Sequence, residues 1–247
     1  MNNINLLKYE IKRTIISKKY LYMILILMAF TYDSLTRLVI GGYYGTAPFS
    51  EWTYTFFIQL ISPLVMSIMI FMMTNIFGEK ELRAKKILFS APISQSKYYM
   101  LKIVGVVVTF ILTALVPIIM SFIYYEILFN FSQFINFGKH IIWFLIPTFI
   151  FLLGVGMVLG KTSSKLLYGL IPIVFLLGSI NTGSIFPLWL DIFGQHFFEI
   201  STFVELFGRT SQAISFNLSS DFIYSRLVFI FLGIILLMYT CFKREKE

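Results

Sequence analysis

The residues that most resemble a reactive site lie in the run Gly156-Met-Val-Leu-Gly160-Lys161-Thr162, which ends like a phosphate-binding loop. Such a loop needs a glycine five residues before its second glycine, where this chain has Val155, and it joins a strand to a helix. Here the run closes an apolar segment instead. We therefore predict no nucleotide site, and the glycines fit a small-xxx-small face that lets two helices approach closely.

Other reactive groups are scarce. The single cysteine, Cys241, cannot form an internal disulfide, and His140 and His196 lack metal-ligand spacing. No Ser/His, paired-carboxylate or metal-ligand set stands at membrane depth. We therefore expect neither an enzyme nor a cofactor or metal within the chain itself.

Apolar side chains dominate the rest of the chain: 58% of residues are apolar, 13% are charged and the mean hydropathy is +0.84. Too few polar side chains remain to cover a soluble protein, so lipid is the expected solvent. Runs near the ~20 residues that a helix needs to cross a bilayer favour helical spans over a β-barrel. The six expected transmembrane helices are Tyr20–Ile40, Trp52–Phe77, Tyr98–Tyr125, His140–Gly160, Leu166–Ile180 and Phe222–Phe242.

Basic residues mark one side of these spans. Seven segments of the chain lie outside the six expected spans. Of the 20 lysines and arginines, 16 lie in or next to the first, third, fifth and seventh of these segments. The other four are Arg37, Lys139, Arg209 and Arg226. The positive-inside rule then places both termini in the cytoplasm, and the net charge of +8 reflects topology instead of nucleic-acid binding.

Few charges fall inside the spans. Asp33 and Arg37 are spaced i, i+4 near the outer end of an uncleaved first span, so they are expected to face each other. The pair is either a structural pair at the mouth of a cavity or a substrate contact. Glu126 and Arg226 lie near outer helix ends, where long side chains can reach water. No chain of carboxylates crosses the bilayer, which counts against a proton-coupled carrier.

The segment before the first span is expected to lie on the membrane. Ile4, Leu7, Ile11 and Ile15 recur at helical spacing, while the lysines fall elsewhere on the wheel. Residues 1–19 are therefore predicted to form an interfacial helix that meets anionic lipid, with a plain cationic flank as the alternative.

The outer spacer between the fifth and sixth spans, residues 181–221, is too apolar for a disordered loop. Phe193 and Phe197 begin an apolar helical stripe, and Asp191 and Gln195 begin a polar one. Membrane-seated helices are predicted here. The short fifth span, which carries Pro172, is expected to join them in a partly re-entrant arrangement.

The inner loop Gly78–Lys97 mixes charge with a compact apolar cluster. Leu82, Leu88 and Phe89 can form the buried side of a short helix that Pro92 stops, with basic residues turned outward. A plain linker has no need of such a cluster. We therefore expect this loop to dock onto a partner.

This loop resembles that of the type 2 ATP-binding-cassette (ABC) exporter permeases, in which the second span is followed by Glu-x-Glu-x-Gly, an apolar coupling helix, Pro-hydrophobic-Ser and a lysine opening the third span. The matching residues are Glu79, Glu81, Leu88, Phe89, Pro92, Ile93, Ser94 and Lys102, while Arg83 replaces the family's glycine. The resemblance extends over the order of elements along the whole chain. It implies one all-α permease domain over 1–247, divided into 1–19, 20–77 (spans 1 and 2), 78–97 (coupling loop), 98–180 (spans 3 to 5), 181–221 and 222–247 (span 6 and tail).

The resemblance implies a mechanism as well. Two permease subunits, identical or related, would pair in a bacterial cell membrane, and each would dock its loop onto a separate ATPase that holds ATP and Mg. The implied docking residues are Glu79, Glu81, Arg83, Leu88, Phe89 and Pro92. Among relatives, exporters of amphipathic peptides such as bacteriocins and phenol-soluble modulins fit an interior with few charges. The acidic Asp191, Glu199 and Glu205 are candidates for attracting cationic peptides.

Two readings compete with an exporter. A secondary carrier would need substrate and ion groups at mid-membrane and often shows internal repeats, neither of which is evident. A membrane scaffold without transport is compatible with every feature above. A neighbouring reading frame that encodes an ATPase would favour the exporter.

Overall fold

The computed structural model describes residues 3–43, 46–78, 81, 83, 94–180, 186–198 and 216–243, and the regular secondary structure in these ranges is helical. The α-helices are α1 (Asn3–Ile15), α2 (Lys18–Ser34), α3 (Glu51–Met73), α5 (Gln95–Phe129), α6 (Gly138–Thr162), α7 (Ser164–Ser179) and α9 (Ser220–Phe242). The π-helix η1 (Leu35–Val39) continues α2, and the 3-10 helix η3 (Phe134–Phe137) leads into α6. The predicted all-helical fold is confirmed.

Serine residues begin most of the long helices. The hydroxyl oxygens of Ser17, Ser50, Ser94 and Ser219 each accept a hydrogen bond from the backbone N–H three residues later, at the starts of α2, α3, α5 and α9. Ser163 caps α7 in a similar way. A serine oxygen satisfies one of the amides that a helix start leaves without a partner, so these residues fix where the apolar helices begin.

Among the described residues, five helical stretches are long and apolar enough to cross a membrane: Lys18–Val39, Glu51–Met73, Gln95–Phe129, Phe134–Thr162 and Ser220–Phe242. They indicate a multi-pass membrane protein. The expected fifth span is present as α7, but it has only 16 residues. At 1.5 Å per residue it is about 24 Å long, which is less than the ~30 Å hydrocarbon core, so a full sixth crossing stays a prediction.

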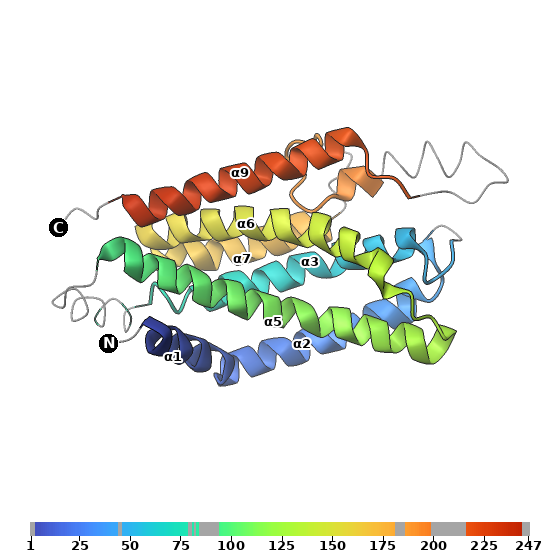
Figure 1. Ribbon diagram of the computed structural model, residues 1–247, viewed down its shortest axis with the longest axis horizontal. Helices are drawn as coiled ribbons and strands as arrows, with labels where there is room; N and C mark the ends of the chain where they lie inside the picture. The colour runs from blue at the N-terminus through green and yellow to red at the C-terminus, as the bar shows by residue number, and fades with distance from the viewer. Residues whose placement is uncertain are drawn as a thin grey trace.

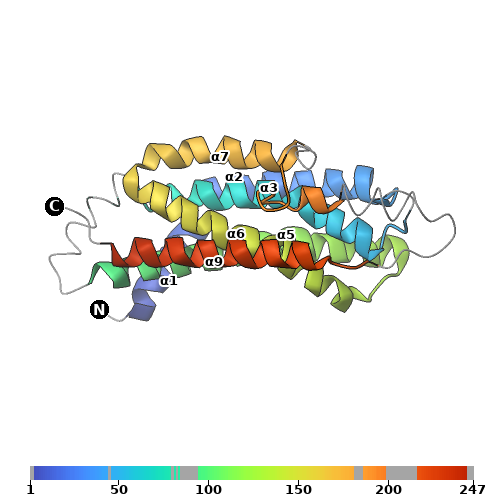
Figure 2. The same cartoon turned by 90° about the horizontal axis from the view of Figure 1, so that it is seen from above.

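The long helices lie roughly side by side, with α3 at the centre of the bundle (Figures 1 and 2). In α3, 78% of the most apolar stretch is buried, compared with 28% in α2 and in α9. The outer helices present large exposed side chains such as Leu21, Ile123 and Phe231. In lipid such side chains need no cover, so their exposure fits membrane-facing helices.

Glycine contacts hold α6 against two neighbours. A Cβ atom on Gly154 would lie 2.7 Å from the carbonyl oxygen of Gly233, so the backbones of α6 and α9 touch there. On another face, a Cβ on Gly160 would lie 2.4 Å from the ring of Phe77, and one on Gly156 would lie 2.8 Å from Met73. The close helix packing predicted for Gly156 and Gly160 is therefore present, with the end of α3 as one partner.

One end of the bundle, here called the basic end, gathers α1, the start of α5, the end of α6 and the end of α9 (Figure 1). Lys161 Nζ donates to the carbonyl oxygens of Thr240 (3.0 Å) and Lys243 (2.6 Å), and Ser96 Oγ donates to that of Cys241 (2.8 Å). The described basic residues that the sequence assigned to one side share this end. The starts of α6 and α9, which carry Lys139 and Arg226, lie at the opposite end, here called the far end (Figure 1).

Candidate functional site

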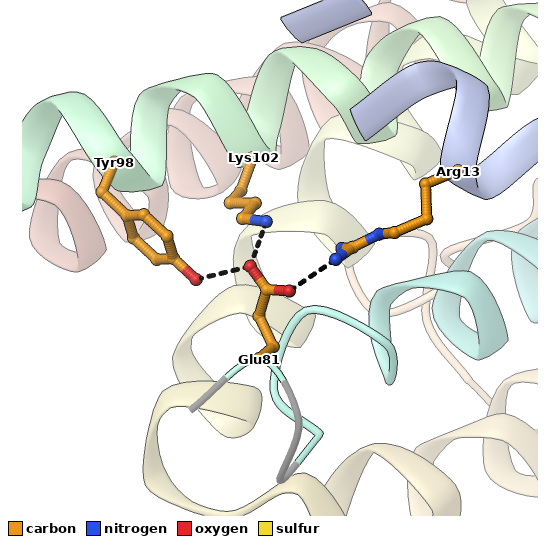
Figure 3. Close-up of polar contacts among 4 residues, drawn as sticks. All are labelled: Arg13, Glu81, Tyr98 and Lys102. Carbon is orange, nitrogen blue, oxygen red and sulfur yellow. Dashed lines mark hydrogen bonds and ion pairs between the residues drawn. The ribbon is translucent and has the colours of Figure 1, made fainter. Parts of the chain in front are cut away.

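A buried polar cluster surrounds Glu81 at the basic end (Figure 3). Arg13 Nη1 donates to Glu81 Oε2 at 2.7 Å, and Tyr98 Oη donates to Oε1 at 3.1 Å. Lys102 Nζ also donates to Oε1, in an ion pair. Three donors from two helices thus meet one carboxylate, and we call these four residues the Glu81 cluster.

Burial makes this cluster unlike an ordinary surface ion pair. The side chains of Glu81 and Lys102 are each 5% exposed, whereas that of Arg13 is 38% exposed. Burial alone would raise the pKa of Glu81. The hydrogen bonds and positive charges of Lys102 and Arg13 outweigh it and hold the pKa of Glu81 below its ordinary value. Glu81 is therefore ionised at neutral pH and bound on both oxygens.

The cluster joins three parts of the chain that are distant in sequence. Arg13 lies on α1, Tyr98 and Lys102 lie one turn apart on α5, and Glu81 lies in the segment that follows α3. Tyr98 and Lys102 reach the same oxygen because residues spaced i, i+4 share a helix face. Movement of the segment that carries Glu81 would therefore act on α1 and α5 directly.

The residues predicted to dock onto a partner are only partly described. Glu79, Leu88, Phe89 and Pro92 lie outside the described residues, as does the apolar Leu82. Arg83 is exposed, in agreement with an outward role. Glu81 was expected to face the partner, but its side chain is turned into the bundle and bonded within the chain. Sequence reasoning missed this set of contacts, although the lysine and tyrosine on one face of α5 are a visible signal for it.

A second polar cluster lies in the half of the bundle nearest the far end, around Asp191. Asp191 Oδ1 accepts hydrogen bonds from the backbone N–H groups of Phe193 (3.1 Å) and Gly194 (2.8 Å), and Oδ2 accepts one from that of His196 (2.7 Å). Arg226 donates to the carbonyl oxygens of Ile192 (2.7 Å) and Asp191 (2.8 Å). Side chains thus satisfy backbone groups of the non-helical residues 191–194 and of the helical turn that follows them.

Arg226 corrects one expectation. Its side chain was expected to reach water near a helix end, but it is 0% exposed, with its guanidinium 4.5 Å from the ring centre of Phe222. Asp191 is likewise 4% exposed and engaged by three backbone amides. The side chain of Asp191 therefore binds the local backbone. Glu199 and Glu205 lie outside the described residues.

The depth of this segment follows from α7. A Cβ on Gly178, near the end of α7, would lie 2.1 Å from Pro63, which is midway along α3. Gln195 Nε2 donates to the Gly178 carbonyl at 2.8 Å, and Thr148 Oγ1, inside α6, donates to that of Ile192 at 2.7 Å. The helix α7 thus ends beside the middle of α3, and residues 191–198 pack within the half of the bundle nearest the far end. This agrees with the predicted partly re-entrant arrangement.

Asp33 and Arg37 form the predicted pair, with Arg37 Nε 2.6 Å from Asp33 Oδ1. Their side chains are 53% and 78% exposed. An exposed pair of this kind contributes little to stability. A narrow cleft lined by residues that include Met69, Lys102 and Val106 lies at the basic end, and neither Asp33 nor Arg37 lines it, so a role at a cavity mouth stays a prediction.

Lys161, the lysine of the run that ends like a phosphate-binding loop, has a structural role. Its ammonium caps carbonyl oxygens at the end of α9 and lies 4.9 Å from the ring centre of Tyr99. A cation at a helix C-terminus satisfies the last carbonyl groups and the helix dipole. Within the described ranges, no group of three or more His, Cys, Asp and Glu side chains is placed to hold a metal ion.

Comparison of the chain with protein-family models, with curated proteins and with solved structures finds no match. The functional interpretation therefore depends on the residues and contacts described above.

Proposed function

We propose that the chain is the membrane-spanning permease subunit of an ATP-driven ABC exporter. In this proposal the segment 78–97 faces the cytoplasm and docks onto a separate ATPase, which supplies the ATP and Mg site. The permease works as a pair in a bacterial cell membrane, with six crossings and both termini inside. The cargo is an amphipathic molecule, with a membrane-active peptide as the best candidate.

The observation that carries this proposal is the Glu81 cluster. A coupling loop must pass its movement to membrane helices, and a buried carboxylate bonded to α1 and α5 provides a rigid connection between them. Breaking a buried ion pair is costly, so the segment and the helices move as one body and not independently. A loop that only connected α3 to α5 would have no movement to pass on, and it would not need a rigid connection to α1.

Residues of the loop have different roles in this proposal, according to the direction of their side chains. Glu81 is turned inward and transmits the movement, while Arg83 is exposed at the surface. In this proposal the apolar Leu88 and Phe89 supply the contact with the ATPase. They belong to the expected short helix that ends at Pro92. A docking helix buries its apolar side in a groove, so a few central residues carry most of the binding energy.

Co-purification tests the proposal. The tagged chain is expressed with the ATPases of its own host, and the double variant Leu88→Ser with Phe89→Ser is compared with wild type. The wild-type chain should retain an ATPase with phosphate-loop and signature motifs, and the double variant should lose it and its export while still inserting in the membrane. Ile16→Ser, at a residue that is 70% exposed at the same end, is the matched control and should retain the ATPase.

Equal recovery of the ATPase with wild type and the double variant would reject the docking role of this loop. Recovery of no ATPase with the wild-type chain would favour a secondary carrier or a scaffold instead.

A further inference from the structure

Several buried hydroxyl groups lie on α2, α3 and α5, which pack against one another pairwise. They belong to Thr31 on α2, to Tyr54 on α3, and to Tyr124 and Tyr125 on α5. Within the described part of the chain, none of these oxygens donates or accepts a hydrogen bond. A buried hydroxyl without a partner is costly, so a set of them on three touching helices points to a partner that the chain does not supply.

The contact between α2 and α5 brings two of these hydroxyls to one level. Tyr20, near the start of α2, is hydrogen-bonded to Thr113 of α5 at 3.1 Å. Both helices run from the basic end to the far end (Figure 1). Thr31 and Tyr124 lie the same number of residues further along their helices, so they lie at a similar level. The electrostatic interaction between Tyr32 and Tyr124 agrees with this alignment.

Aromatic packing places Tyr54 and Tyr125 together. Each is 0% exposed, their ring centres are 6.1 Å apart, and both rings pack against Phe137. Ser121, one turn before Tyr125, lies beside the Tyr54 hydroxyl without hydrogen-bond geometry. The Ser121 hydroxyl donates to the carbonyl oxygen of Ile118 at 2.7 Å, so its oxygen can still accept a hydrogen bond.

Thr31 differs from other threonines in the long helices. The hydroxyls of Thr55, Thr113 and Thr240 each donate to the carbonyl oxygen four residues earlier, at 2.6, 2.8 and 2.9 Å. A threonine inside a helix commonly makes this bond. Thr31 is 0% exposed and does not make it. Its hydroxyl is therefore available to a partner other than the backbone of its own helix.

We propose that an internal water molecule binds between α2, α3 and α5 and bridges these hydroxyls. Buried water typically makes about three hydrogen bonds to polar groups that would otherwise have no partner, which fits this set. Water both donates and accepts, as neutral hydroxyls require, whereas a buried ion would need an opposite charge. The water connects three membrane helices. The proposal does not depend on the exporter function, because it concerns only this junction.

Radiolytic labelling of the full-length chain in lipid nanodiscs tests the proposal. An X-ray pulse converts water, including bound water, into hydroxyl radicals that oxidise the nearest side chains, and mass spectrometry locates them. Tyr54 and Tyr125 should be oxidised although neither is exposed. Phe144 is the matched control, because it is 1% exposed and its ring packs against those of Phe197 and Phe222. Labelling of the two tyrosines no stronger than that of Phe144 would overturn the proposal.

Two variants, Tyr54→Phe and Tyr125→Phe, keep the aromatic packing and remove one hydroxyl each. If water bridges the hydroxyls, each variant loses a hydrogen bond, and its melting temperature should fall by about 3 °C. If the hydroxyls have no partner, removing one should raise the melting temperature instead. Tyr22→Phe, at a residue of α2 that is 60% exposed, is the control and should match wild type. A rise or no change in either buried variant would contradict the bridging water.

The two measurements combined separate bound water from bulk water that enters through local opening of the bundle. In the Tyr54→Phe protein the water loses one of its partners, so oxidation of Tyr125 should fall below the wild-type level. Bulk water would reach Tyr125 equally well in both proteins. Unchanged oxidation of Tyr125 would therefore overturn the proposed site.

Discussion

Arg13 of α1 and Glu81 of the segment after α3 form an ion pair at 2.7 Å, although 68 residues separate them in the chain. The same carboxylate is bonded to Lys102 and Tyr98 of α5. A helix that sequence reasoning treats as a membrane-surface element is thus tied to the body of the bundle. The loop between α3 and α5 is anchored at Glu81 by the same contact.

The first prediction concerns the stability of this cluster. Glu81→Gln leaves Lys102 buried without its counter-charge, so we expect the free energy of unfolding to fall by about 3 kcal/mol. Asp33→Asn makes the same chemical change in an exposed pair and should cost less than about 0.5 kcal/mol. Thermal unfolding of the purified variants in one detergent measures both. Equal losses would show that the Glu81 cluster adds no special stability.

The difference in stability between wild type and Glu81→Gln should depend on pH. The pKa of Glu81 is lower in the folded chain than its ordinary value, so its stabilising contribution is complete above about pH 4.3, the unfolded value. That contribution is lost as the pH falls through the lowered pKa of the folded state. The difference in stability between wild type and Glu81→Gln should therefore be constant near neutrality and shrink below about pH 4. A difference that grows on acidification would contradict the ionised cluster.

The second prediction concerns Arg226. Arg226→Gln leaves the carbonyl groups of Asp191 and Ile192 buried without their donors, so about 3 kcal/mol of stability should be lost. Hydrogen exchange should increase first in residues 191–198. The control is Arg37→Gln, at an arginine whose side chain is 78% exposed, and its exchange there should match wild type. Unchanged exchange in the Arg226 variant would show that other contacts hold this segment.

The positions of the long helices could be predicted from sequence because the signal for them is local. Apolar length decides where a span lies, and a serine before the run decides where it begins, so α3 and α5 start within three residues of their expected limits. The burial of Arg226 could not be predicted in this way. A lone arginine near a helix end usually reaches water, and only the three-dimensional approach of residues 191 and 192 reverses that preference.

The Glu81 cluster was also harder to predict, because it depends on contacts between distant parts of the chain. The acidic and basic residues of the 78–97 loop were visible, but nothing in their spacing indicates that Glu81 turns inward to meet Arg13 and Lys102. Such pairing depends on how α1 packs against α5. Apolar periodicity places α1 on a surface but does not say which surface.

The third prediction concerns topology, which the charge distribution predicts and the helices leave untested. In a Cys241→Ala background, a cysteine replacing Ser90 should react with a membrane-impermeant maleimide only after the cells are opened. A cysteine replacing Ile135, which is 90% exposed between α5 and α6, should react in intact cells. Labelling of the Ser90 position in intact cells would reverse the assignment of the cytoplasmic side.

The fourth prediction concerns ATP. The purified chain should not hydrolyse ATP, because its only phosphate-loop-like run has the wrong glycine spacing and its lysine caps α9. Lys161→Ala should lower the melting temperature, because the last carbonyl groups of α9 lose their cation. Robust ATP turnover that disappears in the Lys161→Ala protein would contradict this role.

Site-specific photo-cross-linking at Phe89 tests the exporter proposal most directly. Benzoylphenylalanine replaces Phe89 in the full-length chain, living cells are irradiated, and the cross-linked partner is identified by mass spectrometry. The same group at Ile135, at the far end, is the control. We predict that the Phe89 probe captures an ATPase with phosphate-loop and signature motifs and that the Ile135 probe does not. Capture of lipid alone, or of the same proteins from both positions, would contradict the proposal that this loop couples ATP hydrolysis to transport.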